Sequence, residues 1–170
     1  MKKIKKKLIV CLTAVFPCMG LSACASDHTY EQIDITMDEL EQKLGDKESF
    51  KLLIERDNCP FCEQLNEYIQ ETKADHGVTV YRLDVTDFDF KRENEGDTTL
   101  VSENENGKKF LEEFPYFLYT PTIYTITDGV PEQAAIGYNG EGQSMSLWDV
   151  DSTIDWDKAD TIGVWEYLEE

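Results

Sequence analysis

The sequence predicts an α/β domain, and two observations carry that prediction. A strand-like run, a Cys-x-x-Cys motif that opens a helix and a second strand-like run follow one another between residues 50 and 85, which is the order of a βαβ unit. Farther along, Asp128-Gly129 separates two apolar runs, and this dipeptide is a strong signal of a β-hairpin. The 170 residues are enough for one domain with tails.

A capping box, the pattern TMDE, predicts the first helix over residues 37–44. Residues 50–54 (FKLLI) form an apolar run of strand length that leads into the cysteine motif. Pro60 suits the first turn of the next helix, which apolar residues at helical spacing extend to about residue 74. Residues 78–85 alternate between apolar and polar side chains and therefore predict a strand.

The second half of the chain has less regular signals. Residues 87–109 are polar and charged, which predicts a long exposed loop or insertion. We expect a short helix over residues 110–117. The hairpin then joins residues 123–127 to a run that ends at Gly137, and residues 158–168 are expected to close the fold as a helix.

Composition supports a globular domain and excludes one class of partner. The chain is 41% hydrophobic and 11% aromatic, which is enough to pack a core although 30% of its residues are charged. Its 16 Lys and Arg face 35 Asp and Glu, which gives a net charge of -19. Because a nucleic-acid binder needs a basic footprint, we expect no nucleic-acid partner.

The first 23 residues have the pattern of a secretory signal. Five lysines in residues 1–7 precede an apolar run, residues 8–21, that is too short to span a bilayer comfortably. The stretch LSAC, residues 21–24, resembles the lipobox of bacterial lipoproteins, whose cysteine is lipidated and becomes the first residue after cleavage. The resemblance implies a protein anchored at the outer face of the cell membrane by lipid on Cys24. An ordinary cleaved signal and an uncleaved anchor are the alternatives.

Cleavage before Cys24 divides the chain into three parts. Residues 1–23 are the signal peptide, residues 24–35 a lipidated tether with a first edge segment, and residues 36–170 the folded domain. The signal carries five lysines and no acid, so its removal changes the net charge from -19 to -24. The two acyl chains of a lipidated cysteine are enough for stable anchoring.

Only Cys59 and Cys62 are then available for chemistry, because Cys11 and Cys18 leave with the signal and Cys24 carries the lipid. A structural zinc site needs two further ligands, and the chain has only two histidines, so we expect no metal. Haem attachment needs a histidine directly after the second cysteine, which this sequence lacks. In an oxidising compartment the Cys-x-x-Cys spacing favours a disulfide that cycles between its two redox states. A structural disulfide and two inert thiols are the alternatives.

The chain resembles the thioredoxin superfamily over most of residues 36–169. The resemblance rests on Cys-Pro-Phe-Cys (residues 59–62) opening a helix after a strand, and on Thr-Pro-Thr (residues 120–122) before the hairpin. It implies a thioredoxin-like fold, with a central mixed β-sheet flanked by helices on both faces. It also implies a cis peptide bond before Pro121, and that Thr120 and Pro121 flank the cysteine pair and bind substrate. The redox-active disulfide then serves without any bound cofactor.

The sequence departs from the thioredoxin pattern near the cysteines. Asn58 precedes Cys59 where thioredoxins have Trp, and the dipeptide between the cysteines is Pro-Phe instead of Gly-Pro. Thioredoxins bury an acidic residue in the strand six positions before the first cysteine, and Leu53 occupies that position here. Glu55 and Glu63 are the two candidates to replace it as proton acceptor for the second cysteine.

The position of each cysteine predicts its role. Cys59 lies at a helix N-terminus, where unpaired N–H groups and the helix dipole favour a thiolate, and we expect it at the more exposed end of the motif. Cys59 is therefore the predicted nucleophile, and Cys62 is expected to resolve the mixed disulfide.

The chain also resembles the thioredoxin-like accessory proteins associated with bacteriocin transport in Gram-positive bacteria. This resemblance implies a thiol–disulfide oxidoreductase whose substrates are exported proteins or peptides and which exchanges electrons with a membrane or extracytoplasmic redox partner. The rival hypothesis is a non-enzymatic accessory protein that binds an exporter or its peptide cargo and keeps the disulfide for stability.

Overall fold

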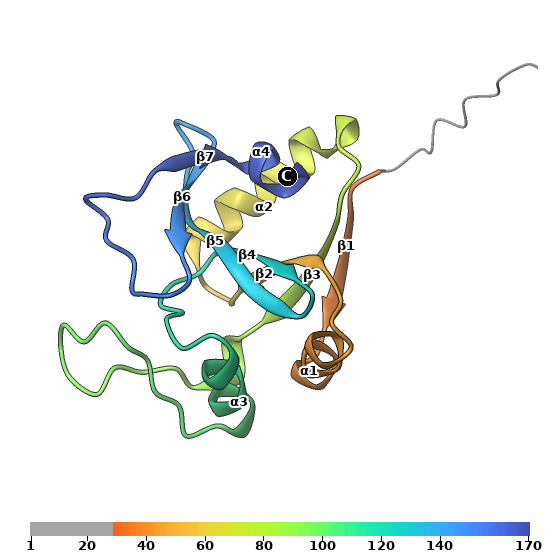
Figure 1. Cartoon of the computed structure of the whole chain (residues 1–170). Helices are drawn as coiled ribbons and strands as arrows, with labels where there is room; N and C mark the ends of the chain where they lie inside the picture. The colour runs from red at the N-terminus through yellow and green to blue at the C-terminus, as the bar shows by residue number, and fades with distance from the viewer. Residues whose placement is uncertain (1–28) are drawn as a thin grey trace, which may run out of the picture.

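A seven-stranded mixed sheet forms the centre of residues 29–170, the part of the chain that the computed structural model describes (Figure 1). The strand order is β1-β3-β2-β4-β5-β6-β7. The first three strands are parallel to one another, and the remaining pairs are antiparallel. The strands are β1 (Glu31–Ile35), β2 (Phe50–Glu55), β3 (Thr79–Asp84), β4 (Thr122–Thr127), β5 (Val130–Asn139), β6 (Ser144–Asp149) and β7 (Thr161–Gly163).

Helices cover both faces of this sheet, and the alternation along β2 shows how. Leu52 and Ile54 pack in one core cluster with residues of α1 (Met37–Gly45) and α3 (Glu105–Glu113). Leu53 points to the other face and packs with residues of α2 (Pro60–Thr72) and α4 (Val164–Glu169). The prediction of an α/β fold with a central mixed sheet and helices on both faces is therefore confirmed.

The predicted capping box starts α1. The Thr36 hydroxyl accepts a hydrogen bond from the backbone N–H of Glu39 (3.3 Å), and the Glu39 carboxylate accepts one from the backbone N–H of Thr36 (2.7 Å). The hydrogen bonds from Thr36 lower the pKa of Glu39 below its ordinary value. This reciprocal pair satisfies two backbone donors that a helix start otherwise leaves free.

The predicted helix over residues 110–117 is wrong in its position, because α3 spans Glu105–Glu113. The Asn104 side chain accepts a hydrogen bond from the N–H of Gly107 (3.1 Å) and so starts the helix inside the segment that was predicted to be a loop. Gly107 lies so close to the carbonyl oxygen of Phe88 that a side chain there would overlap it. The exposed insertion is therefore shorter than residues 87–109, and η2 (Thr86–Phe88), a 3-10 turn, anchors its first residues.

The C-terminal part of the chain contains two strands that the sequence did not predict. Residues 144–149 form β6, which pairs with β5 through Ala134–Trp148 and Ala135–Leu147, and β7 pairs with β6. The predicted helix over residues 158–168 is wrong, because only Val164–Glu169 is helical. In the β6 sequence SMSLWD the alternation of polar and apolar residues stops after four residues, because the apolar Leu147 and Trp148 are adjacent.

The proposed signal of residues 1–23, Cys24 and the start of the tether lie outside the described residues. Between residues 29 and 170, no helix combines the length and the apolar character that crossing a bilayer requires.

Candidate redox site

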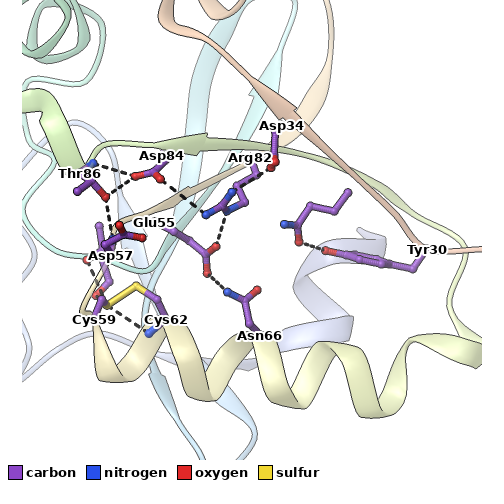
Figure 2. Close-up of polar contacts among 12 residues, drawn as sticks. Tyr30, Asp34, Glu55, Asp57, Cys59, Cys62, Asn66, Arg82, Asp84 and Thr86 are labelled. Carbon is purple, nitrogen blue, oxygen red and sulfur yellow. Dashed lines mark hydrogen bonds and ion pairs between the residues drawn. A yellow bond between two sulfur atoms is a disulfide. The ribbon is translucent and has the colours of Figure 1, made fainter.

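The two cysteines of residues 29–170 form a disulfide at the start of α2, with 5.2 Å between their Cα atoms (Figure 2). Cys59 is the N-cap of the helix, Pro60 follows as the first helical residue, and Cys62 lies in the first turn. The Cys62 backbone N–H donates a hydrogen bond to Cys59 Sγ (3.2 Å). Because this N–H and the helix dipole both favour negative charge, the fold stabilises a thiolate on Cys59.

The segment before β4 lies directly against Cys59. The Thr120–Pro121 peptide bond is cis, as the resemblance implied. The carbonyl oxygen and the hydroxyl oxygen of Thr120 each lie 3.4 Å from Cys59 Sγ. The Pro121 carbonyl instead accepts a hydrogen bond from the N–H of Gly137 (2.8 Å), which ties this segment to β5. Thr120 thus places two polar atoms against Cys59 Sγ.

Exposure does not distinguish the two cysteines, and the expectation that Cys59 is the more exposed one is wrong. Each cysteine is only 3% exposed, because the helix start and the Thr120 segment cover the pair from two sides. The difference lies in access: Cys59, but not Cys62, lines an open groove of about 670 Å³. Arg56 and Phe90 line the same groove, so it opens onto Cys59 beside the insertion and does not reach Cys62.

Of the two candidate proton acceptors, the structure buries Glu55 and leaves Glu63 exposed. Glu55 is 1% exposed at the end of β2, where its carboxylate accepts hydrogen bonds from Asn66 Nδ2 and Arg82 Nε, each at 2.9 Å. Asn66 follows Cys62 by four residues and so lies on the same face of α2. Figure 2 shows the Glu55 carboxylate between β3 and this face of the helix, on the side that carries the disulfide.

Burial and hydrogen bonding act on Glu55 in opposite directions. Burial raises the pKa of Glu55, while the hydrogen bonds from Asn66 and Arg82 lower it, and the net shift is upward. Burial lowers the pKa of Arg82, but its bonds to Asp34 and Glu55 outweigh this and raise it. Burial, aided by the charge of Glu55, also raises the pKa of Tyr30 to about 12. The site therefore holds a carboxyl group that can change its protonation state closer to neutral pH than an exposed one.

A second set of contacts fixes the loop that carries the motif. The Thr86 hydroxyl accepts a hydrogen bond from the backbone N–H of Asp57 (2.8 Å), and Asp84 accepts one from the Thr86 N–H (2.9 Å). Asn58 has a left-handed backbone conformation, with φ of 53°, directly before Cys59. No sequence signal pointed to Thr86, whereas the spacing of Asn66 from Cys62 could have identified Asn66 as a neighbour of the pair.

No protein-family description matches the chain, and the curated proteins contain no match to it. Within residues 29–170, no three His, Cys, Asp or Glu side chains are grouped so that they could hold a metal ion. The chemistry that the described site supports directly is that of the Cys59–Cys62 pair, which is compatible with a redox function.

Proposed function

We propose that this chain is a thioredoxin-like thiol–disulfide oxidoreductase that acts on exported proteins or peptides. The observation that carries the proposal is the disulfide at the N-terminus of α2 with Thr120 against Cys59 Sγ. A thioredoxin-like fold is supported by three features: the parallel pairing of β1 and β2 with β3, the helix that follows β2, and the cis peptide bond before β4. The cysteine pair carries the two electrons in its dithiol form and gives them up when the disulfide closes, so the proposed reaction needs no bound cofactor.

In the proposed reaction the Cys59 thiolate attacks one sulfur of a substrate disulfide. A Cys59–substrate bond forms, and the other substrate sulfur leaves as a thiolate and takes up a proton. Cys62 then loses its proton and attacks Cys59 Sγ, which closes the Cys59–Cys62 disulfide and releases the second substrate thiol. The substrate gains two electrons, and the cysteine pair loses them. The reverse sequence oxidises a substrate dithiol, and a redox partner outside the cytoplasm restores the starting state.

The proposed location follows from the N-terminal segment. Lipid on Cys24 anchors the protein to the outer face of the cell membrane, and the domain works outside the cytoplasm, where disulfides persist. This location and the disulfide chemistry together support a role like that of bacteriocin transport accessory proteins in Gram-positive bacteria. The excess of acidic residues, with a net charge of -19 for the whole chain, suits cationic peptide substrates.

We expect Glu55→Gln to slow the resolving step by about 10²-fold at neutral pH, because a positioned proton acceptor contributes roughly that much. In the native protein the rate of the resolving step should fall as the pH drops through the raised pKa of Glu55. In the variant this loss of rate at low pH should disappear. Stopped-flow exchange rates across the pH range measure both effects. Glu63→Gln changes an exposed carboxylate in the first turn of α2, next to Cys62, and serves as the matched control. Equal pH profiles for the two variants would contradict the assignment of Glu55.

The stability of the same variant gives an independent check on Glu55. Because its pKa is raised, the folded protein keeps this proton to higher pH than the unfolded chain. The resulting stability is full below the ordinary carboxyl pKa of 4.5 and is lost as the pH rises through the folded value. Glu55→Gln should remove this fall in the free energy of unfolding.

A redox titration of the full chain in detergent tests the proposed function. The protein is equilibrated in graded glutathione or dithiothreitol buffers, its thiols are alkylated, and the alkylated forms are counted by mass. We expect a reversible two-electron transition of Cys59 and Cys62 with a midpoint between about -120 and -270 mV, the range of known redox-active pairs. The upper end indicates oxidation or isomerisation of substrates, and the lower end indicates reduction.

The burial of both cysteines favours the rival function, a non-enzymatic accessory protein for peptide export. In that case the disulfide stays closed until below roughly -300 mV, as structural disulfides do, or opens only on unfolding. Either result of the titration would contradict the oxidoreductase function and favour the binding function.

A further inference from the structure

Exposed aromatic side chains gather beside the disulfide, near β5 and β6. Among the described residues, five large hydrophobic side chains are exposed, and three of them, Phe61 (55%), Tyr119 (41%) and Trp156 (51%), line one hollow of about 330 Å³. The ring centroids of Tyr119 and Trp156 are 5.8 Å apart. Apolar side chains that cluster at the surface around a hollow are typical of a binding site.

This hollow adjoins the reactive sulfur. Phe61, Tyr119 and Thr120 line both the hollow and the groove that contains Cys59, so the two adjoin at these residues. Thr120 also contacts Cys59 Sγ at 3.4 Å. A polypeptide whose cysteine reacts with Cys59 therefore brings its neighbouring side chains within reach of the hollow.

The lining of the hollow is apolar at its centre and carries no charge. Tyr138 of β5 and Met145 of β6 complete the apolar wall, and hydroxyl and amide groups supply the remaining contacts. A charged side chain would lose its hydration there without gaining an ionic partner, whereas an apolar one is favoured by leaving water. The volume is at the lower end of the roughly 300–1,000 Å³ of ligand pockets, which suits one large side chain better than a cofactor.

The chain next to the hollow is acidic. Asp155 and Asp157 flank Trp156, Asp160 precedes the lining residue Thr161, and all three acids are exposed. Lys158 forms an ion pair with Asp155 (2.6 Å) and leaves the other two acids in excess. Asp155 and Asp160 also line a separate groove, and Arg92 lies over the Tyr119 ring at 5.3 Å. The negative charge beside the hollow therefore comes from the segment of residues 155–160, which complements basic residues next to an apolar one.

We propose that this hollow selects the substrate: it binds a large aromatic or apolar side chain next to the reacting cysteine, in a polypeptide segment that also carries basic residues. The inference rests on the proposed function, because it assigns a substrate class to the same disulfide. Phe61 and Trp156 hold the side chain, and the acids of residues 155–160 attract its basic neighbours. Thr120 holds the substrate cysteine at Cys59.

Single-cysteine peptides test the inference. Each peptide carries a nitrothiobenzoate group in a disulfide with its cysteine, and attack by reduced protein on the peptide sulfur releases the coloured thiolate. The peptides differ only in the residue next to cysteine, which is Trp, Leu, Arg or Ser, and in basic or acidic flanks. The glutathione–nitrothiobenzoate disulfide is the small reference substrate. The variants of the full chain are Trp156→Ala, Trp156→Phe and, as control, Val130→Ala, an exposed apolar residue that does not line the hollow.

We expect the native protein to attack the Trp peptide about tenfold faster than the Ser peptide, a discrimination within reach of an apolar pocket. Trp156→Ala should reduce this ratio to about twofold, while Trp156→Phe and Val130→Ala keep most of it. The preference for basic flanks should weaken as salt is raised. Because the ratio compares two substrates on one variant, a general loss of folded protein does not change it.

Three results overturn the inference while the proposed function stands. All peptides and the reference disulfide react at similar rates, Trp156→Ala keeps the full preference, or the Arg peptide reacts fastest. A native protein that reacts with neither the peptides nor the reference disulfide would instead overturn the proposed function. The reference substrate therefore separates the two failures.

Discussion

Cys59→Ser should reduce the rate of thiol–disulfide exchange by about 10³-fold or more, because Cys59 Sγ is the proposed attacking atom. This sulfur accepts a hydrogen bond from the Cys62 N–H and lies against Thr120. Cys62→Ser should behave differently. Its Cys59 still attacks, but no second thiol resolves the product, so the protein accumulates as a mixed disulfide with its substrate. Exchange rates measure the first effect, and mass spectrometry of the trapped adduct measures the second.

The double variant, Cys59→Ser with Cys62→Ser, is the control for adducts formed elsewhere on the protein. An adduct on Cys62 in the Cys59→Ser protein, at a rate near that of the native chain, would reverse the assigned roles. The equal burial of the two sulfurs makes this a real test, since accessibility to solvent does not favour Cys59. The assignment depends on the groove and on the helix N-terminus alone.

Phe110→Ala should lower the free energy of unfolding by about 3–5 kcal/mol, the usual cost of removing a fully buried phenyl ring. The Phe110 ring lies at the centre of an aromatic cluster between α3 and the sheet. Its neighbours, with ring centroids between 4.7 and 6.1 Å away, are Phe88, Phe90, Phe114 and Phe117. Urea unfolding followed by circular dichroism at fixed redox state measures the change.

Val101→Ala serves as the comparison for Phe110→Ala, because Val101 is an exposed apolar residue in the segment that precedes α3. It should change the stability by less than about 0.5 kcal/mol. Phe90 and Phe117 line the groove beside Cys59, so Phe110→Ala should also slow the exchange reaction. A loss of less than about 1 kcal/mol would mean that α3 does not belong to the cooperative core.

Local sequence signals predicted the elements around the cysteines well. The capping box at Thr36, the strand before the motif and the Asp-Gly hairpin each depend on a few neighbouring residues, and each is found where it was expected. The mixed sheet with helices on both faces followed from the same local signals and from the family resemblance.

The prediction failed where tertiary pairing decides the structure. The strand β6 forms because it can pair with β5 and bury Met145 and Trp148, and neither partner is visible in its own six residues. The early start of α3 depends on Asn104 as N-cap and on the close approach of Gly107 to Phe88, which is a long-range contact. Sequence analysis based on hydrophobic periodicity therefore missed β6 and placed the start of α3 too late.

The candidate site was predictable in its sulfur chemistry and less so in its surroundings. Spacing and position identified Cys59 and Cys62, and the resemblance identified Thr120 and Pro121. The choice between Glu55 and Glu63 needed the structure, because it depends on which carboxylate the fold buries. Arg82 joins the site through the parallel pairing of β2 with β3, which sequence spacing does not reveal.

The parallel direction of β1, β2 and β3 gives the molecule a polarity. The described chain enters the sheet at the amino end of β1, where Tyr30 packs edge-on against Trp165 of the C-terminal helix. The disulfide follows the opposite, carboxyl end of β2, about 20 Å away for a strand of this length. The disulfide therefore lies at the end of the parallel strands opposite to the end at which the described chain enters the sheet.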